Sequence, residues 1–198
     1  MIAPPFRPLI FVDMDEVLSN FIGALCELRG VDESKLESGI YDLPRLFGTT
    51  FAEIDGQLRN NYEFWLTIKP FAWAKPMMQF LDGIGDTFII SAPWKNSPSC
   101  HMAKLDWCQN VLGIPGDRIF LNQNKHLIAR HGRILIDDRV DNCVLWATAG
   151  GAAIPFPALH NKIHCLGGNP LNHVIAVMEQ TIERIKEQHK NVQLHAQN

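Results

Sequence analysis

Two acidic residues, Asp13 and Asp15, directly follow the apolar run at residues 9–12. If this run is a buried strand, both carboxylates can point into a crevice at its end. Buried carboxylates are costly unless a cation or hydrogen bonds compensate them, and Mg²⁺ prefers oxygen ligands. With a metal ion on one oxygen of Asp13, the other oxygen can attack phosphorus, and Asp15 can serve as general acid and base. The pair alone is a weak motif, because two acids can equally cap a following helix.

Further polar residues occur near the ends of other apolar runs. Ser91 offers a hydroxyl and nearby free backbone amides that suit a phosphate oxygen, although for this segment alone a turn or helix cap is the better explanation. Lys125 lies shortly after another run, where an exposed lysine is the ordinary explanation. Asp137 and Asp138 follow the run 133–136. Because two adjacent acids repel unless a cation bridges them, this pair favours a functional role.

The elements that must position these residues alternate along the chain. Apolar runs predict strands at 9–12, 87–90, 118–121 and 133–136. Helical patterns predict helices at 19–29, 76–81, 99–112 and 170–190. Strand–helix alternation indicates an α/β fold with a Rossmann-like parallel sheet and helices on both faces. Ligands of such sheets bind at the carboxyl ends of the strands, where the acids, the serine and the lysine are expected.

Residues 31–73 have a different texture, with many aromatic residues and no strand alternation. We expect them to form a small, mainly helical cap, inserted after the first acid pair. The core domain would then consist of residues 1–30 and 74–198. A chain of 198 residues is long enough for one α/β domain with such an insertion.

Composition limits the partners and the compartment. The net charge of -3 gives no general attraction to a nucleic acid polymer or an anionic membrane, so a small molecule is the expected partner. We find no membrane-length apolar run and no secretory signal pattern. The five cysteines lack metal-site or redox spacing, which favours reduced thiols and a cytoplasmic location. A homodimer is compatible with the sequence, which does not fix the oligomeric state.

The order of acid pair, hydroxyl, lysine and acid pair resembles the four motifs of the haloacid-dehalogenase (HAD) superfamily of phosphatases. In that superfamily the fold is a Rossmann-like sheet with a cap inserted after the first motif, which agrees with the insertion at 31–73. The matching residues are Asp13 and Asp15 for the first motif, Ser91 for the second, Lys125 for the third, and Asp137 and Asp138 for the fourth.

A closer resemblance is to the 5'(3')-deoxyribonucleotidases. It rests on residues 13–21, on the stretch from 91 to 107 and on residues 135–139, and it extends over about residues 9–161. Two residues depart from that family. Glu16 stands where many members have glycine, and Ala92 stands where the mammalian-type enzymes usually have serine. Both departures bear on substrate preference more than on the reaction.

The resemblance implies roles for the catalytic residues. Asp13 would be the nucleophile and a Mg²⁺ ligand, and Asp15 would be the acid and base and give its backbone carbonyl to the metal. Asp138 would be the third protein ligand, and Asp137 would support the site from behind. The phosphate-binding residues would be Ser91, Lys104 and Lys125.

The resemblance also implies residues that contact the rest of the substrate. Three aromatic rings would line the slot for base and sugar, namely Phe21, Phe64 and Trp65. Three further residues would lie near the substrate, namely Ala92, Lys95 and Arg139. The alternative for each ring is that it forms the cap's own hydrophobic core. We assign Phe47, Phe51, Phe71 and Trp73 to packing, and we assign no chemistry to His160.

The sequence therefore predicts a magnesium-dependent phosphomonoester hydrolase that acts on (deoxy)ribonucleoside monophosphates through an aspartyl-phosphate. Two alternatives remain open. The same chemistry could act on another small phosphate ester, such as a sugar phosphate. A receiver-type phospho-acceptor module also combines acids, a hydroxyl and a lysine around magnesium, but there the paired acids come first and the lysine comes last. A non-catalytic binding protein is disfavoured because each expected catalytic position is present.

Overall fold

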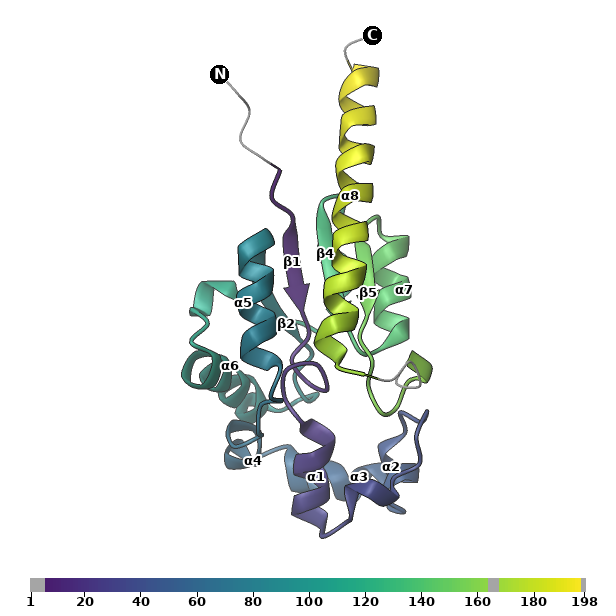
Figure 1. The fold of residues 1–198 in the computed structure, drawn as a ribbon. Helices are drawn as coiled ribbons and strands as arrows, with labels where there is room; N and C mark the ends of the chain where they lie inside the picture. The colour runs from purple at the N-terminus through teal and green to yellow at the C-terminus, as the bar shows by residue number, and fades with distance from the viewer. Residues whose placement is uncertain (1–5, 164–167, 197–198) are drawn as a thin grey trace.

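The computed structural model of the chain describes residues 6–163 and 168–196, with side chains in the last helix described as far as residue 188. The described residues contain a five-stranded parallel sheet in the order β3-β2-β1-β4-β5. The strands are β1 (Leu9–Val12), β2 (Asp86–Ser91), β3 (Ile119–Leu121), β4 (Arg133–Asp137) and β5 (Ala152–Pro155) (Figure 1). Apolar runs predicted the first four of these strands, and β5, with its sequence Ala-Ala-Ile-Pro, was not predicted.

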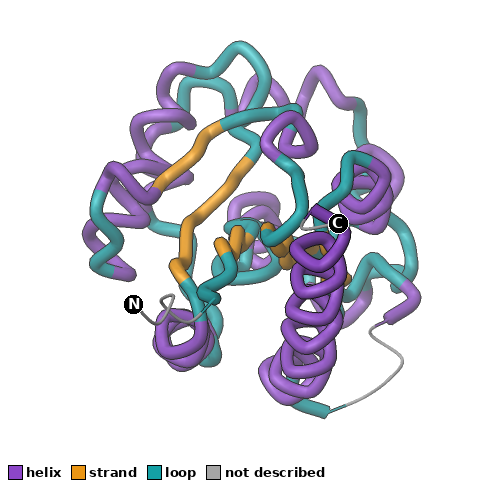
Figure 2. The backbone as a smooth tube through the Cα atoms, turned by 90° about the horizontal axis from the view of Figure 1, so that it is seen from above, coloured by secondary structure: helices purple, strands orange, loops and turns teal. Residues whose placement is uncertain are grey.

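Helices cover both faces of the sheet, as predicted. Alternate residues of β1 face opposite sides: Ile10 belongs to one hydrophobic cluster and Phe11 to another. The first cluster includes side chains of α5 (Ala74–Ile84), α6 (Pro98–Leu112) and α8 (Pro170–Ala196), and the second includes Trp146 of α7 (Val140–Thr148). Figure 2 shows the strands passing through the middle of the molecule with helices to either side. The Rossmann-like α/β fold predicted from the alternating pattern is confirmed.

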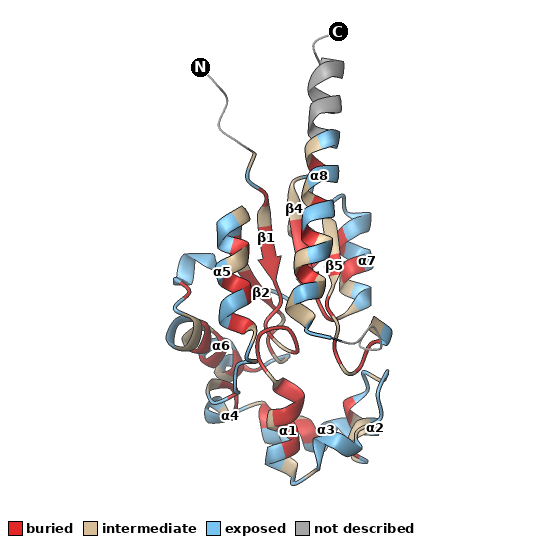
Figure 3. Cartoon of the chain, viewed as in Figure 1, coloured by how far each residue is buried: buried red, intermediate tan, exposed pale blue. Residues whose placement is uncertain are grey.

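The insertion between β1 and α5 is helical. It contains α1 (Phe21–Arg29), η1 (Glu33–Lys35), α2 (Leu43–Leu46), α3 (Phe51–Leu58) and α4 (Tyr62–Leu66). Its buried residues form a separate hydrophobic cluster, coloured red at the lower end of Figure 3, in which Leu25 of α1 joins Ile54 of α3 and Trp65 of α4. Helix α1 thus packs with residues 31–73, although it precedes the predicted cap boundary. That boundary remains a prediction.

Two further features complete the described chain. Short 3-10 helices occur at η2 (Gly116–Arg118) and η3 (Lys125–Ile128). Helix α8 is 27 residues long and continues past the end of the sheet (Figure 1). Within the described residues, no helix combines the length and the apolar character needed to cross a membrane.

The strand register brings the loops of interest to one edge. Val12 of β1 lies opposite Ile89 of β2 and Ile136 of β4. The next residue, Asp13, donates its backbone N–H to the carbonyl of Ile136 at 2.9 Å. Because all these strands run parallel, the residues that follow them leave the sheet at the same edge, which faces the helical insertion.

Candidate active site

A cavity of about 630 Å³ lies between the carboxyl ends of the strands and the helical insertion. This volume is within the usual range for a small-molecule site. Its lining includes seven of the residues predicted for catalysis, metal or substrate from the core, namely Asp13, Asp15, Ala92, Lys95, Lys125, Asp138 and Arg139, and two from the insertion, namely Phe21 and Trp65. Loops after β1, β2 and β4 contribute to it, as a strand-end site requires.

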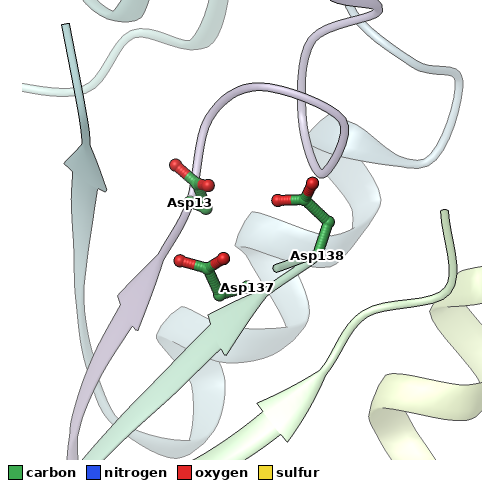
Figure 4. Close-up of side chains that lie close together, drawn as sticks. All are labelled: Asp13, Asp137 and Asp138. Carbon is green, nitrogen blue, oxygen red and sulfur yellow. The ribbon is translucent and has the colours of Figure 1, made fainter. Parts of the chain in front are cut away.

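Three carboxylates form a compact cluster at the floor of this cavity. One oxygen from each of Asp13, Asp137 and Asp138 lies within 4.8 Å of the others, and all three residues are buried. Figure 4 shows the carboxylates side by side at the ends of β1 and β4. Lys125 Nζ lies 2.8 Å from Asp13 Oδ2 and 2.6 Å from Asp137 Oδ2. Since three carboxylates face one ammonium group, negative charge is in excess.

The pKa values express this excess charge. Burial raises the pKa of Asp13, and Asp137 adds to the rise, although Lys125 opposes it. Burial raises the pKa of Asp138 well above its ordinary value, reinforced by repulsion from Asp13 and Asp137. For Lys125 burial acts to lower the pKa, but the two carboxylates outweigh it and the net direction is upward.

A divalent metal ion would fit this site. Its side-chain donors are all carboxylate oxygens, which suit hard cations such as Mg²⁺, Ca²⁺ or Mn²⁺. Burial and repulsion raise the pKa of Asp138 well above its ordinary value, so an added cation would stabilise its ionised form. Asp137 is well held without a metal, because it accepts hydrogen bonds from Arg139 N at 2.9 Å and from Asn142 Nδ2 at 3.1 Å. Asp13 and Asp138 are therefore the carboxylates best placed to receive an ion.

Asp15 is held by a second buried cation. Lys104 of α6 is fully buried, and its ammonium group forms an ion pair with Asp15 Oδ2 and donates to Ser91 Oγ at 2.8 Å. Ser19 Oγ donates to the other oxygen, Asp15 Oδ1, at 3.2 Å. The side chain of Asp15 is 24% exposed and faces the cavity. Neither Ser91 nor Lys104 lies among the described residues that line the cavity, so both meet behind Asp15, and their phosphate-binding role stays a prediction.

Aromatic rings form one wall of the cavity. Phe21 stacks on Trp65 with a centroid distance of 5.5 Å and an interplanar angle of 6°. Phe64 packs edge-on against Trp65 from behind and lines a different hollow. Successive residues of a helix point in directions about 100° apart, so the neighbouring rings of α4 cannot both face the cavity. The structure therefore places Phe64 behind the slot in which we predicted it.

A second aromatic pair lines the cavity, and the sequence did not indicate it. Phe51 stacks on Trp94 with a centroid distance of 5.5 Å and an angle of 10°, and both rings line the cavity. Trp94 is held by Asp55, which accepts a hydrogen bond from its indole nitrogen at 2.8 Å. Phe51 is 55% exposed, so its assignment to packing is wrong. It is the first residue of α3, ahead of the inward-facing Ile54, and nothing in the sequence places a cavity next to it.

The structure shows how a glutamate is accommodated at position 16, where many members of the resembling family have glycine. Its backbone φ of 60° lies in the left-handed region, where glycine is favoured. The side chain turns back and its Oε1 accepts the N–H of Ile22 at 2.7 Å, which satisfies a free donor in the first turn of α1. Burial raises the pKa of this carboxyl to about 8. The carboxylate thus offers a local hydrogen bond that glycine would lack.

His160 and Tyr41 are two further residues beside the cluster that the sequence did not indicate. His160 is 8% exposed, and its Nε2 lies 2.8 Å from Asp138 Oδ2. Tyr41 lines the cavity and its ring packs on His160 with a centroid distance of 4.7 Å. Burial lowers the pKa of His160 to about 4, so the ring is neutral at pH 7. Its position after β5 could not be inferred, because β5 itself was not predicted.

The sheet order, the helical insertion after β1 and the acids at the strand ends define a haloacid-dehalogenase-like fold. A haloacid dehalogenase-like family hydrolase from Xanthomonas campestris superposes with a TM-score of 0.54 at 11% identity, covering 92% of this chain and 95% of that one. A HAD family hydrolase from Deinococcus radiodurans R1, determined with bound phosphate and sodium, gives a TM-score of 0.51 at 14% identity, covering 89% of this chain and 97% of that one. Both confirm the fold.

The sequence comparison points to a narrower relative. A protein of Vibrio phage KVP40, provisionally assigned as a 5'(3')-deoxyribonucleotidase, is 28% identical over 138 residues, which are 69% of each chain. No family model matches the chain. The resemblance to HAD-type hydrolases and to 5'(3')-deoxyribonucleotidases, first noted from the motifs, is confirmed.

Proposed function

We propose that this protein is a magnesium-dependent phosphomonoester hydrolase that acts on (deoxy)ribonucleoside monophosphates. One observation carries the proposal: the carboxylates of Asp13 and Asp138 converge with Lys125 at the floor of a cavity whose walls are stacked aromatic rings. The floor suits a metal ion and a phosphate group, and the walls suit a nucleobase.

Mg²⁺ is the ion we assign to the floor. The carboxylates of Asp13 and Asp138 would hold it together with the backbone carbonyl of Asp15. When bound, it would neutralise the excess buried charge and polarise a phosphoryl oxygen. We favour Mg²⁺ because it is commonly held by one or two carboxylates together with substrate phosphate, rather than by a full cage of protein ligands.

The residues of the chain supply the covalent and proton-transfer steps. Asp13 lies at the floor with Oδ1 accepting the N–H of Met14 at 2.7 Å, which orients the carboxylate. A carboxylate oxygen of Asp13 attacks phosphorus, and the bond from phosphorus to the nucleoside oxygen breaks as Asp15 gives that oxygen a proton. Asp15 then takes a proton from water, whose oxygen attacks the aspartyl-phosphate, freeing inorganic phosphate and restoring Asp13.

Two buried lysines hold these acids in place. Lys125 lies against Asp13 and limits the accumulation of negative charge around the phosphate. Lys104 holds Asp15 from the side of α6, and its Nζ also lies 5.6 Å from the centroid of the Trp65 ring. The acid and the aromatic wall are therefore positioned by the same side chain.

The walls favour a nucleotide over a smaller ester. Stacking of a base on an aromatic ring contributes about 1–3 kcal/mol. Of the two cavity-lining pairs, Phe51 with Trp94 offers the open face for such stacking, because Phe51 is exposed whereas Phe21 and Trp65 are buried in the core of the insertion. A sugar phosphate would leave this face unused. The name of the phage relative agrees with a nucleotide substrate.

A phosphate-release screen tests the proposal. Purified protein with Mg²⁺ is assayed against common nucleoside monophosphates, both ribo and deoxy, and against ribose 5-phosphate and glucose 6-phosphate. We expect turnover of nucleotides that stops on chelation and is abolished in Asp13→Asn. Wild-type turnover by Asp13→Asn would refute the mechanism, and a clear preference for sugar phosphates would refute the substrate class.

A further inference from the structure

His160 is a buried polar side chain that the proposed reaction does not use. It lies after β5, and it is more than nine-tenths buried at 8% exposure. In the described part of the chain, neither of its ring nitrogens makes an aligned hydrogen bond. An imidazole that is buried without hydrogen bonds costs free energy, so its position calls for a compensating role.

Polar groups of Asp138 lie beside this imidazole. His160 Nε2 lies 2.8 Å from Asp138 Oδ2, which is a hydrogen-bond distance without the alignment of one. The adjacent residue, Asn161, already holds the backbone of Asp138, since its Nδ2 donates to the carbonyl of Asp138 at 2.8 Å. Contacts of this kind commonly straighten only when the site is filled. The loop after β5 thus contacts both the backbone and the side chain of Asp138.

The other side of His160 is covered by the helical insertion. The Tyr41 ring packs on the imidazole at a centroid distance of 4.7 Å and lies 5.1 Å from Arg139 Cζ. Two residues earlier, Gly39 donates its backbone N–H to the carbonyl of Leu159 at 2.9 Å. The segment around Tyr41 is therefore tied to the same loop that holds Asp138.

We propose that His160 is a positioning residue that donates from Nε2 to the Asp138 carboxylate when a metal ion is bound, and that Tyr41 keeps its ring in place. The inference rests on the proposed function, because it assigns Asp138 as a metal ligand. It adds that affinity for the ion depends on two residues that do not touch it. Side chains that orient metal ligands typically change metal affinity by about 10- to 100-fold when removed.

Binding of Mn²⁺ to the substrate-free protein, measured from the loss of the free-ion EPR signal, tests this role without relying on activity. Mn²⁺ favours the same oxygen ligands as Mg²⁺. His160→Leu keeps a bulky side chain under Tyr41 but removes the donor, and we expect it to weaken Mn²⁺ binding by about 10-fold or more. His160→Gln restores a donor near the Nε2 position and should recover most of the affinity.

Four other variants complete the set. Tyr41→Ala should weaken Mn²⁺ binding, whereas Tyr41→Phe keeps the ring and should bind as the wild type does. His101→Ala, at an exposed histidine of α6, is the matched control. If His160→Leu does not fold, as judged by thermal unfolding, His160→Asn gives the same test, because its shorter amide cannot reach Asp138.

The outcomes separate this inference from the proposed function. Wild-type Mn²⁺ affinity in the Leu or Asn variant overturns the role of His160 even if the wild type hydrolyses nucleotides. Equal loss in His160→Gln and His160→Leu, with His101→Ala unchanged, overturns the donor role. A wild type that binds Mn²⁺ but releases no phosphate from any ester refutes the proposed function and leaves the positioning role standing.

Discussion

Replacing Lys125 with methionine should destabilise the metal-free protein strongly. Lys125 is 3% exposed and contacts two buried carboxylates, Asp13 at 2.8 Å and Asp137 at 2.6 Å. Methionine has a similar length and fills the space, so the change removes the charge and little volume. Among the described residues, no cationic side chain then contacts either Asp13 or Asp137.

The size of the loss follows from burial. Removing one partner of a buried ion pair costs about 3–5 kcal/mol, because the other charge is left without compensation. A typical domain is stable by about 5–15 kcal/mol, so Lys125→Met should lose a large share of its stability. A divalent ion supplies positive charge to the same cluster, and ligand binding at a hundred times its dissociation constant adds about 2.7 kcal/mol. We therefore expect Mg²⁺ to recover much of the loss.

Urea unfolding, followed by tryptophan fluorescence, measures the free energy of unfolding of the wild type and of Lys125→Met, once in EDTA and once in Mg²⁺. The matched control is Lys69→Met, which breaks an exposed ion pair with Glu27 and should change stability little. A loss for Lys125→Met in EDTA that equals the loss for Lys69→Met would refute the reasoning. A deficit that Mg²⁺ leaves unchanged would refute the assignment of the ion to this cluster.

Three further predictions concern substrate, backbone and pH. Phe51→Ala should raise KM for nucleotides by about 5- to 150-fold, which is the range that loss of one stacked ring implies. The kcat should stay nearly unchanged, and hydrolysis of ribose 5-phosphate should not be affected. Equal effects on both esters would contradict stacking. Glu16→Ala should be less stable than Glu16→Gly by about 1 kcal/mol, because both lose the cap but only alanine keeps the left-handed strain; equal urea midpoints would contradict this. Burial raises the pKa of Cys100 to about 11 from 9.0, so its contribution to stability is complete below pH 9 and is lost as pH rises from 9 to 11. Site-resolved alkylation of the native protein at pH 8 should leave Cys100 unmodified, and rapid labelling there would contradict its burial.

Most of the sheet could be predicted from sequence because buried parallel strands appear as continuous apolar runs. Strand β5 is short and only weakly apolar, so it shows no such run. Because β5 was not predicted, the loop that follows it and carries His160 could not be placed next to the site. The helical nature of residues 31–73 was also predictable from the lack of strand alternation. The packing of α1 with that segment could not be predicted, because the apolar face of a helix does not indicate which element it will pack against.

Within the site, convergence of the acids was predictable and their pairing was not. Asp13 and Asp138 had to meet, because the carboxyl ends of parallel strands share one edge. By contrast, Lys104 is on a helix, where a lysine is ordinarily exposed, yet it is fully buried between Asp15 and Ser91. For a similar reason the sequence did not indicate that Phe51, rather than Phe64, lines the cavity, since aromatic residues serve core and cavity alike.

By itself, the sequence determined which chemical groups this protein carries and which edge of the sheet they occupy, because buried parallel strands and the polar residues that follow them appear as local patterns along the chain. Only the tertiary structure decided which lysine contacts which acid, which rings face the cavity and that His160 lies against Asp138. Those contacts join residues far apart in the chain, and their geometry depends on how the helices pack, which no local pattern records.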